Sequence, residues 1–109
     1  MKIQYKNQKI EKLCNQQAVA QQTFGKPVAI KLQTRIAEIK AASRVTELIA
    51  GDPHPLKGNR LGQFSLSFSE SERVVFKPNQ DPIPRHEDSS IDWSQVINII
   101  IVFIGDYHV

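Results

Sequence analysis

The start of the chain alternates apolar and polar positions and then changes to a helical period. Residues 2–6 place Ile3 and Tyr5 between polar neighbours, which predicts a half-buried strand that pairs with a later segment. From Asn7, a residue suited to helix capping, apolar side chains recur at helical spacing up to Gly25. This segment predicts one helix, with apolar positions at Ile10, Leu13, Cys14 and Ala18.

A second helix is predicted directly after Gly25. Lys26-Pro27 restarts the chain with proline at a position that the first turn of a helix tolerates. The apolar residues at i, i+4, i+8 and i+11 then share one face: Val28, Leu32, Ile36 and Ile39. Ser43 is placed to cap a further short turn that ends at Gly51. Two consecutive helices of this kind pack most simply as a hairpin.

The second half of the chain predicts strands separated by irregular segments. Two prolines and two glycines in residues 52–62 favour a loop without regular structure. Residues 64–68 alternate apolar side chains with serine, and residues 73–77 return after a polar turn, so together they predict an antiparallel hairpin. Residues 78–92 are polar and hold three prolines, which is typical of an inserted loop. The segment 98–104, which is apolar from Ile99 onward, predicts a central strand with both faces covered and helices on one side.

The predicted order is strand, helix, helix, strand, strand, strand. It favours an α+β fold in which two N-terminal helices pack on one face of a small, mainly antiparallel sheet. The 109 residues suit a single domain, 1–109, with 78–92 as an insertion. The lone Cys14 cannot form an intramolecular disulfide, and we expect it to be a buried, inert thiol in a reducing cytoplasm. No apolar run has the length of a membrane span or the character of a signal peptide, so we expect a cytoplasmic protein with no membrane partner.

Charge is distributed unevenly along the chain. Residues 1–60 hold eleven Lys and Arg against four Asp and Glu, whereas residues 61–109 hold three against seven. A positive half can attract a polyanion such as nucleic acid. A solvated, lysine-rich helical face explains the same asymmetry, so charge alone leaves both interpretations open.

Two histidines occur at informative places, His54 in the loop before the hairpin and His108 beyond the last strand. If that strand is central, its end can approach the loop. Cleavage of RNA by attack of its 2′-hydroxyl needs a base, an acid, and cations that neutralise the charge on the phosphorane. The candidate catalytic residues are His54, Asp106 and His108, and the candidates for holding substrate are Lys57, Arg60, Arg73 and Tyr107.

These residues also have ordinary explanations. A terminal histidine is more often a solvated surface group, and Lys57 is equally suited to be a turn cation. Arg73 lies near Glu70 and Glu72, where an exposed ion pair would account for it. Tyr107 is as suited to packing as to stacking on a base. Taken alone, the residues indicate no more than a basic α+β domain.

We expect no metal site and no cofactor. The run His86-Glu87-Asp88 lacks the ligand spacing of a zinc or calcium site. Residues 58–62 are bounded by glycines but lack the lysine and the following helix of a phosphate-binding loop.

Four motifs from residue 54 onward carry a resemblance to a known family. They are the His-Pro-Leu-Lys-Gly loop at 54–58, the alternating segment 64–68 after Gly62, the Arg-Val-Val-Phe run at 73–76, and the ending Asp106-Tyr107-His108. In this order they resemble the HigB-type killer toxins of bacterial toxin-antitoxin modules, which belong to the RelE/ParE superfamily.

The resemblance implies a ribosome-dependent mRNA endonuclease that halts translation. Its partners would be the ribosome with its rRNA, mRNA, and an inhibitory antitoxin, usually a helix-turn-helix protein of the HigA type whose complex binds operator DNA. By position, the resemblance implies that His54 and His108 are the acid-base pair, that Asp106 assists them, that Lys57 and Arg73 hold the phosphate, and that Tyr107 supports the base or substrate. The 78–92 insertion could cover the site, contact the ribosome or meet the antitoxin.

Two other functions fit the same scaffold, since a fold does not determine a function. One is a non-enzymatic toxin resembling the ParE branch, which would inhibit DNA gyrase through a binding surface, although the histidine set argues against it. The other is a degenerate toxin that retains only antitoxin binding.

Overall fold

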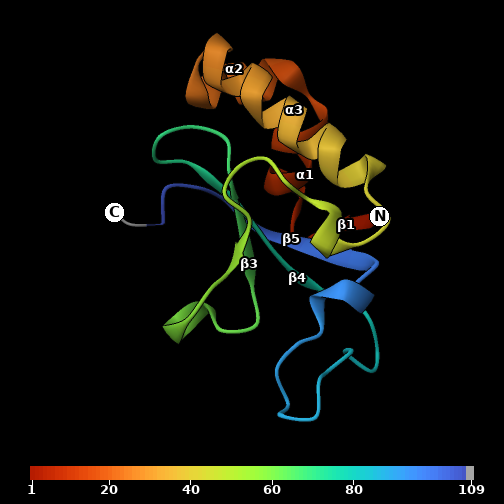
Figure 1. Ribbon diagram of the computed structural model, residues 1–109. Helices are drawn as coiled ribbons and strands as arrows, with labels where there is room; N and C mark the ends of the chain where they lie inside the picture. Colours follow the sequence, from red (N-terminus) through yellow and green to blue (C-terminus); the bar gives the residue numbers. More distant parts are fainter. Residues whose placement is uncertain (108–109) are drawn as a thin grey trace.

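The computed structural model describes residues 1–107, which form a five-stranded sheet with three α-helices on one face (Figure 1). The strands are β1 (Lys2–Tyr5), β2 (His54–Pro55), β3 (Phe64–Ser67), β4 (Arg73–Pro78) and β5 (Asn98–Gly105), and the helices are α1 (Gln8–Asn15), α2 (Gln17–Phe24) and α3 (Lys26–Ala41). The strand order is β1-β5-β4-β3-β2, in which β1 and β5 are parallel and the other neighbours antiparallel. The predicted α+β class, with helices on one face of a mainly antiparallel sheet, is confirmed. Within residues 1–107, none of the helices combines the length and the hydrophobicity that a membrane-spanning segment needs.

The first predicted helix is divided in two. As predicted, Asn7 caps α1, and its side-chain oxygen accepts a hydrogen bond from the N–H of Ile10 at 2.9 Å. Gln16 then adopts an extended backbone, with φ −121° and ψ 105°, before α2 begins. The change of direction brings the ring of Phe24 to 5.4 Å from that of Phe68 in an edge-to-face contact. The single helix predicted for this region is wrong because tertiary packing, with no Gly or Pro as a signal, breaks it.

One short strand lies in a segment predicted to be irregular. Prolines and glycines in residues 52–62 predict a loop, but His54 and Pro55 form β2 opposite Ser65 and Phe64. Because β2 is at the edge of the sheet, a proline that lacks an N–H donor is tolerated there. His54 is therefore attached to the sheet.

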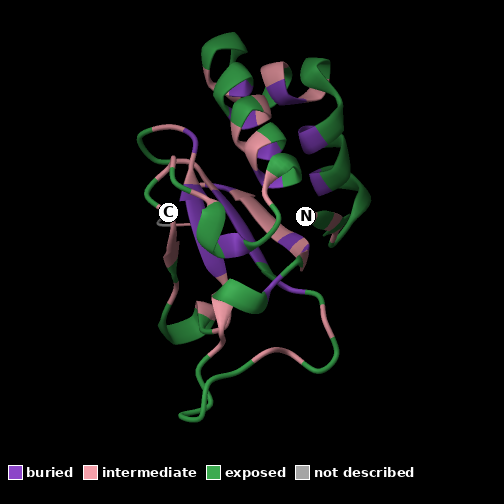
Figure 2. Cartoon of the chain, turned by 45° about the vertical axis from the view of Figure 1, so that its right-hand side comes forward, coloured by how far each residue is buried: buried purple, intermediate pink, exposed green. Residues whose placement is uncertain are grey.

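The core lies between the helices and the sheet, where Figure 2 shows the buried positions turned inward. Helix α3 buries Ala29, Leu32, Ile36 and Ile39, so the predicted face is confirmed except that Ala29 takes the place of the half-buried Val28. Cys14 is 1% exposed in this core, and burial raises the pKa of its thiol to about 12. The predicted burial of the thiol is confirmed, and its inertness stays a prediction that the raised pKa favours.

The other face of the sheet is less covered than the sequence predicts. Ile99 and Ile101 are fully buried toward the helices, but Asn98 and Ile100, which alternate with them, are only half-buried. The prediction of a central strand with helices on one side is confirmed, but cover on the other face of β5 is only partial, because its residues there are half-buried. We call the opposite side of the sheet the helix-free face.

Candidate functional site

A row of four residues crosses the helix-free face from β2 to β5. His54 lies opposite Ser65, Ser65 opposite Val75, and Val75 opposite Phe103. Residues that lie directly opposite one another across a strand pair point to the same face, so all four side chains share it. Neighbouring strands are about 4.8 Å apart, which separates the backbones of His54 and Phe103 by roughly 14 Å.

A backbone carbonyl orients the His54 ring at one end of this row. Its Nδ1 lies 2.7 Å from the carbonyl oxygen of Asp52. A carbonyl can only accept, so Nδ1 carries the proton and, in the neutral ring, Nε2 keeps its lone pair. The side chain is 43% exposed, which leaves the ring accessible to a substrate. In this tautomer, the accessible Nε2 of His54 is the ring nitrogen that can accept a proton.

The turn that precedes His54 has an unusual backbone. Gly51 and Asp52 have φ values of +86° and +50°, both in the left-handed region. The N–H of Ser67 donates to the carbonyl of Gly51 at 2.7 Å, and Nε of Arg35 donates to the carbonyl of Ser67 at 2.8 Å. These two hydrogen bonds connect helix α3, strand β3 and the turn, and this connection fixes the backbone that precedes His54.

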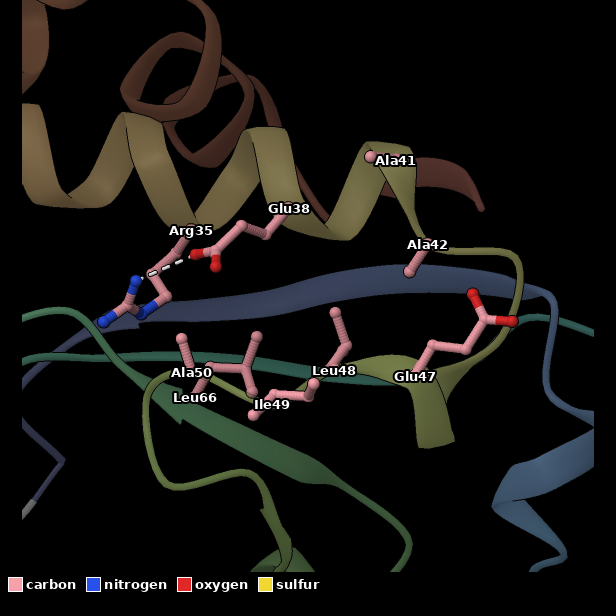
Figure 3. Close-up of a pocket in the computed structure, with 9 residues that line it drawn as sticks. All are labelled: Arg35, Glu38, Ala41, Ala42, Glu47, Leu48, Ile49, Ala50 and Leu66. Carbon is pink, nitrogen blue, oxygen red and sulfur yellow. Dashed lines mark hydrogen bonds and ion pairs between the residues drawn. The ribbon is translucent and has the colours of Figure 1, made fainter.

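A cavity of about 300 Å³ lies beside these hydrogen bonds, between α3, residues 41–50 and β3 (Figure 3). Arg35 and Glu38 form an ion pair at 2.8 Å on its α3 side. The rest of its lining is Ala41, Ala42, Glu47, Leu48, Ile49, Ala50 and Leu66. Because its cation is already bonded to Glu38 and Ser67, and no histidine lines it, this cavity lacks the groups for RNA cleavage.

A second cavity brings together three of the residues predicted to hold substrate. Lys57, Arg60 and Tyr107 line a space of about 240 Å³ together with Leu56 and Asn59. This is below the roughly 300–1,000 Å³ of pockets that enclose drug-sized ligands, so it suits a group of the size of a phosphate. Both charged residues in its lining are cations, which favours an anion. We call it the cationic cavity.

Arg60 is packed against aromatic rings at the edge of the cationic cavity. The centre of its guanidinium lies 4.7 Å from the ring centre of Phe103 and 5.2 Å from that of Tyr107. The two rings meet edge to face at 6.2 Å. One guanidinium nitrogen also donates to Oε1 of Gln63 at 3.0 Å. These contacts join the loop after β2 to the end of β5.

Arg73, which the sequence also assigns to the phosphate, is bonded elsewhere. It pairs with Gly105 in the sheet, and its guanidinium donates to the carbonyl oxygens of Ser69, Glu70 and Glu72 at 3.3, 3.4 and 3.1 Å. Among residues 1–107 it forms no ion pair with Glu70 or Glu72, so that ordinary explanation is wrong. Arg73 stabilises the turn between β3 and β4, and it does not line the cationic cavity.

The final candidates are described as far as Tyr107. Asp106 is half-buried directly after β5. His108 lies outside the described residues, so its predicted approach to His54 stays a prediction. Within the described range, no group of three or more His, Cys, Asp and Glu side chains is arranged to hold a metal ion.

The inserted segment contacts the loop that follows β2. A cavity of about 650 Å³ lies between them, lined by residues that include Leu56, Leu61, Ile91 and Trp93, and Leu56 also lines the cationic cavity. Hydrogen bonds from the hydroxyls of Ser90 and Ser94 lower the pKa of Asp88 and Asp92, so both carboxyl groups are anionic near neutral pH. The acidic side chains make this segment a poorer surface for RNA than the cationic cavity.

Sequence reasoning missed three residues of the site. Phe103 lies within an apolar run, which predicts a covered position in a strand and no contact with a cation. Ser65 gave no signal, although its hydroxyl is buried and has no hydrogen-bond partner among the described residues. Asp52 lies in a segment that predicts only a loop, but the sequence Gly-Asp-Pro just before His54 is typical of a tight turn.

Comparison with known proteins identifies the fold. No family model and no curated protein matches the sequence. A YoeB/ParE toxin from Agrobacterium tumefaciens matches with a TM-score of 0.59 and 15% identity, over 98% of this chain and 99% of that one. A chain of the YoeB-YefM complex from Staphylococcus aureus matches with a TM-score of 0.59 and 18% identity, over 100% and 98%. The YoeB dimer from the same organism matches with a TM-score of 0.56 and 19% identity, over 100% of this chain and 98% of that one.

The chain has the fold of the YoeB/ParE toxins. The fold that the resemblance to RelE/ParE toxins implies is therefore confirmed, and the HigB subtype stays a prediction. In this YoeB-like fold, the row of residues on the helix-free face begins at His54 and ends at Phe103. At that end, the rings of Phe103 and Tyr107 pack against the guanidinium of Arg60.

Proposed function

We propose that this protein is the toxin of a type II toxin-antitoxin module and that it cleaves mRNA on the ribosome. The observation that carries the proposal is the pairing of a proton-accepting His54 with a cationic cavity on the loop that follows it. The YoeB-like fold and the ordered HigB-like motifs support the same activity. HigB remains our proposal for the subtype because the ending Asp106-Tyr107-His108 resembles that group.

The chemistry follows from the functional groups at the site. Nε2 of His54 takes the proton from a ribose 2′-hydroxyl, and that oxygen attacks the adjacent phosphorus. The bond from phosphorus to the 5′-oxygen breaks, and His108, assisted by Asp106, supplies the proton that this leaving oxygen needs. Lys57 neutralises the charge that develops on the phosphorane. The products are a 2′,3′-cyclic phosphate and a 5′-hydroxyl.

The antitoxin follows from the same proposal. One matched structure is a YoeB-YefM complex, so an inhibitory protein partner is expected for this chain as well. The HigB-like motifs favour a helix-turn-helix antitoxin of the HigA type, whose complex with the toxin would bind operator DNA. A YefM-type antitoxin is the alternative that identification of the partner would reveal.

Expression in bacteria tests the proposal. Wild type should arrest growth and produce new mRNA ends within translated regions, and His54→Ala and His108→Ala should do neither. Lys31→Ala, on the exposed side of α3, is the matched control and should behave as wild type. Equal arrest by wild type and both histidine variants would contradict the catalytic roles.

Two other outcomes would identify the alternative functions. Intact RNA together with inhibited supercoiling by gyrase would indicate the ParE-like function. An absence of toxicity with retained antitoxin binding would indicate a degenerate toxin.

A further inference from the structure

We propose that Arg60 is a positioning residue, which holds Tyr107 against the cationic cavity instead of binding the phosphate itself. The inference rests on the proposed cleavage of RNA, but the contact on which it depends can be tested in the protein alone.

The loop that carries Arg60 is closed on itself. The N–H of Leu56 donates to the carbonyl of Gln63 at 2.9 Å, and the N–H of Gln63 donates to the carbonyl of Arg60 at 3.0 Å. Inside the loop, the N–H of Arg60 donates to the carbonyl of Lys57 at 3.2 Å. These hydrogen bonds fix the backbone of the loop, so the side chains of Arg60 and Lys57 extend from a common, preorganised backbone.

The guanidinium of Arg60 has partners on several sides. Phe103 and Tyr107 lie 4.7 and 5.2 Å from its centre, within the range of cation–π contacts, and Gln63 accepts one of its N–H groups. Arginine suits this place because its planar, delocalised cation stacks on aromatic faces, whereas the ammonium of lysine is compact and strongly hydrated. Such packing orients Arg60 toward the rings.

The two aromatic partners differ in how firmly the backbone holds them. Phe103 lies within β5 and is paired with Val75. Tyr107 follows Gly105, the last residue of the strand, whose φ of +143° belongs to the region that glycine favours. Phe103 contacts Tyr107 directly, edge to face at 6.2 Å, and the guanidinium of Arg60 contacts both rings. Because Arg60 belongs to the same loop as Lys57, it adds the contact that fixes Tyr107 relative to Lys57.

The first test compares the mobility of the purified variants by hydrogen exchange. Arg60→Lys keeps the charge but loses the stacking, and it should exchange faster at the amides of residues 105–107. Phe103→Leu should do the same. Lys57→Gln is the control and should leave this exchange unchanged. Unchanged exchange in Arg60→Lys would overturn the positioning role, whether or not the protein cleaves RNA.

The second test uses cleavage of ribosome-bound mRNA. A positioning role predicts that Arg60→Lys lowers kcat by about tenfold to a hundredfold with little change in KM, because small misplacements of catalytic groups are costly. Phe103→Leu should lower kcat similarly, and the double variant should be no worse than either single variant. If Arg60 instead binds the phosphate, Arg60→Lys should retain near wild-type kcat and Phe103→Leu should have no effect. If the wild type does not cleave ribosome-bound mRNA, the proposed function is refuted, and the hydrogen-exchange test alone decides whether Arg60 positions Tyr107.

Discussion

The Nδ1 atom of His54 lies 2.7 Å from the carbonyl oxygen of Asp52, and this contact determines which ring nitrogen can accept a proton. The carbonyl belongs to a left-handed turn, and the N–H of Ser67 in β3 donates to its first residue, Gly51. The hydrogen bond that orients the imidazole is therefore made by the backbone of a turn, and the carboxylate of Asp52 lies farther from the same nitrogen, at 3.8 Å.

Substitutions at these two residues should have unequal effects. His54→Ala should lower the rate of RNA cleavage by about 10²- to 10⁴-fold, the usual contribution of a general base, with binding largely retained. Asp52→Asn keeps the carbonyl, and asparagine tolerates positive φ, so its rate should stay close to that of wild type. Single-turnover kinetics would measure both. A large loss in Asp52→Asn would show that the carboxylate, and not the carbonyl, sets the state of the ring.

Two glycines provide a matched pair of stability variants. A Cβ at Gly51 would lie 2.6 Å from the carbonyl oxygen of Ser67, so Gly51→Ala should lower the free energy of unfolding by roughly 2 kcal/mol or more. Gly58 also has positive φ, but a Cβ there meets nothing within 4 Å, so Gly58→Ala should cost only about 1–2 kcal/mol of backbone strain. Urea denaturation would compare them. Equal losses would mean that the approach of Ser67 does not constrain the turn.

The buried hydroxyl of Ser65 should reduce stability. It lies in the row between His54 and Val75 and has no hydrogen-bond partner among residues 1–107. Ser65→Ala removes a polar group whose burial costs about 1–3 kcal/mol when it is unpaired, so the free energy of unfolding should rise by about 1 kcal/mol. Ser67→Ala, at a half-buried position in the same strand, should change little. A destabilised Ser65→Ala would show that the hydroxyl makes a favourable interaction.

The sequence predicts the strands and the core better than it predicts the site. Residues 64–68 alternate clearly and the run 73–77 returns after a polar turn, so β3 and β4 are confirmed, and the helical spacing from Val28 to Ile39 identifies α3. The break at Gln16 and the two-residue strand at His54 depend on tertiary contacts that no local pattern records. Periodicity predicts local structure, whereas these features arise from packing between distant segments.

The site shows the same division between residue type and geometry. Lys57, Arg60 and Tyr107 were predicted to hold substrate and do line one cavity, whereas Arg73 is bonded to turn carbonyls. Residue type indicates which groups suit the chemistry, but hydrogen bonding decides which are available. Phe103 could not be recognised from its apolar run, because its contact with Arg60 is formed only when the loop folds.

Burial of Cys14 predicts a dependence of stability on alkaline pH. The pKa of its thiol is raised from 9.0 to about 12 in the folded protein. Below pH 9 the thiol is protonated in both states, and between pH 9 and 12 it ionises only in the unfolded chain, so stability should fall over that range. Denaturation at pH 7 and pH 10.5 should show a smaller fall in Cys14→Ala than in wild type. Identical falls would mean that the folded protein does not protect the thiol from ionisation.

The most direct test of the central claim is cleavage of an mRNA that carries one 2′-deoxynucleotide at the cleaved position. Purified protein would be added to ribosomes programmed with this message or with the same message made entirely of ribonucleotides. If His54 activates a 2′-hydroxyl, the all-ribose message should be cut to a cyclic phosphate and a 5′-hydroxyl, and the deoxy-substituted message should remain intact at that position. Equal cleavage of both messages, or cleavage of neither, would contradict the account.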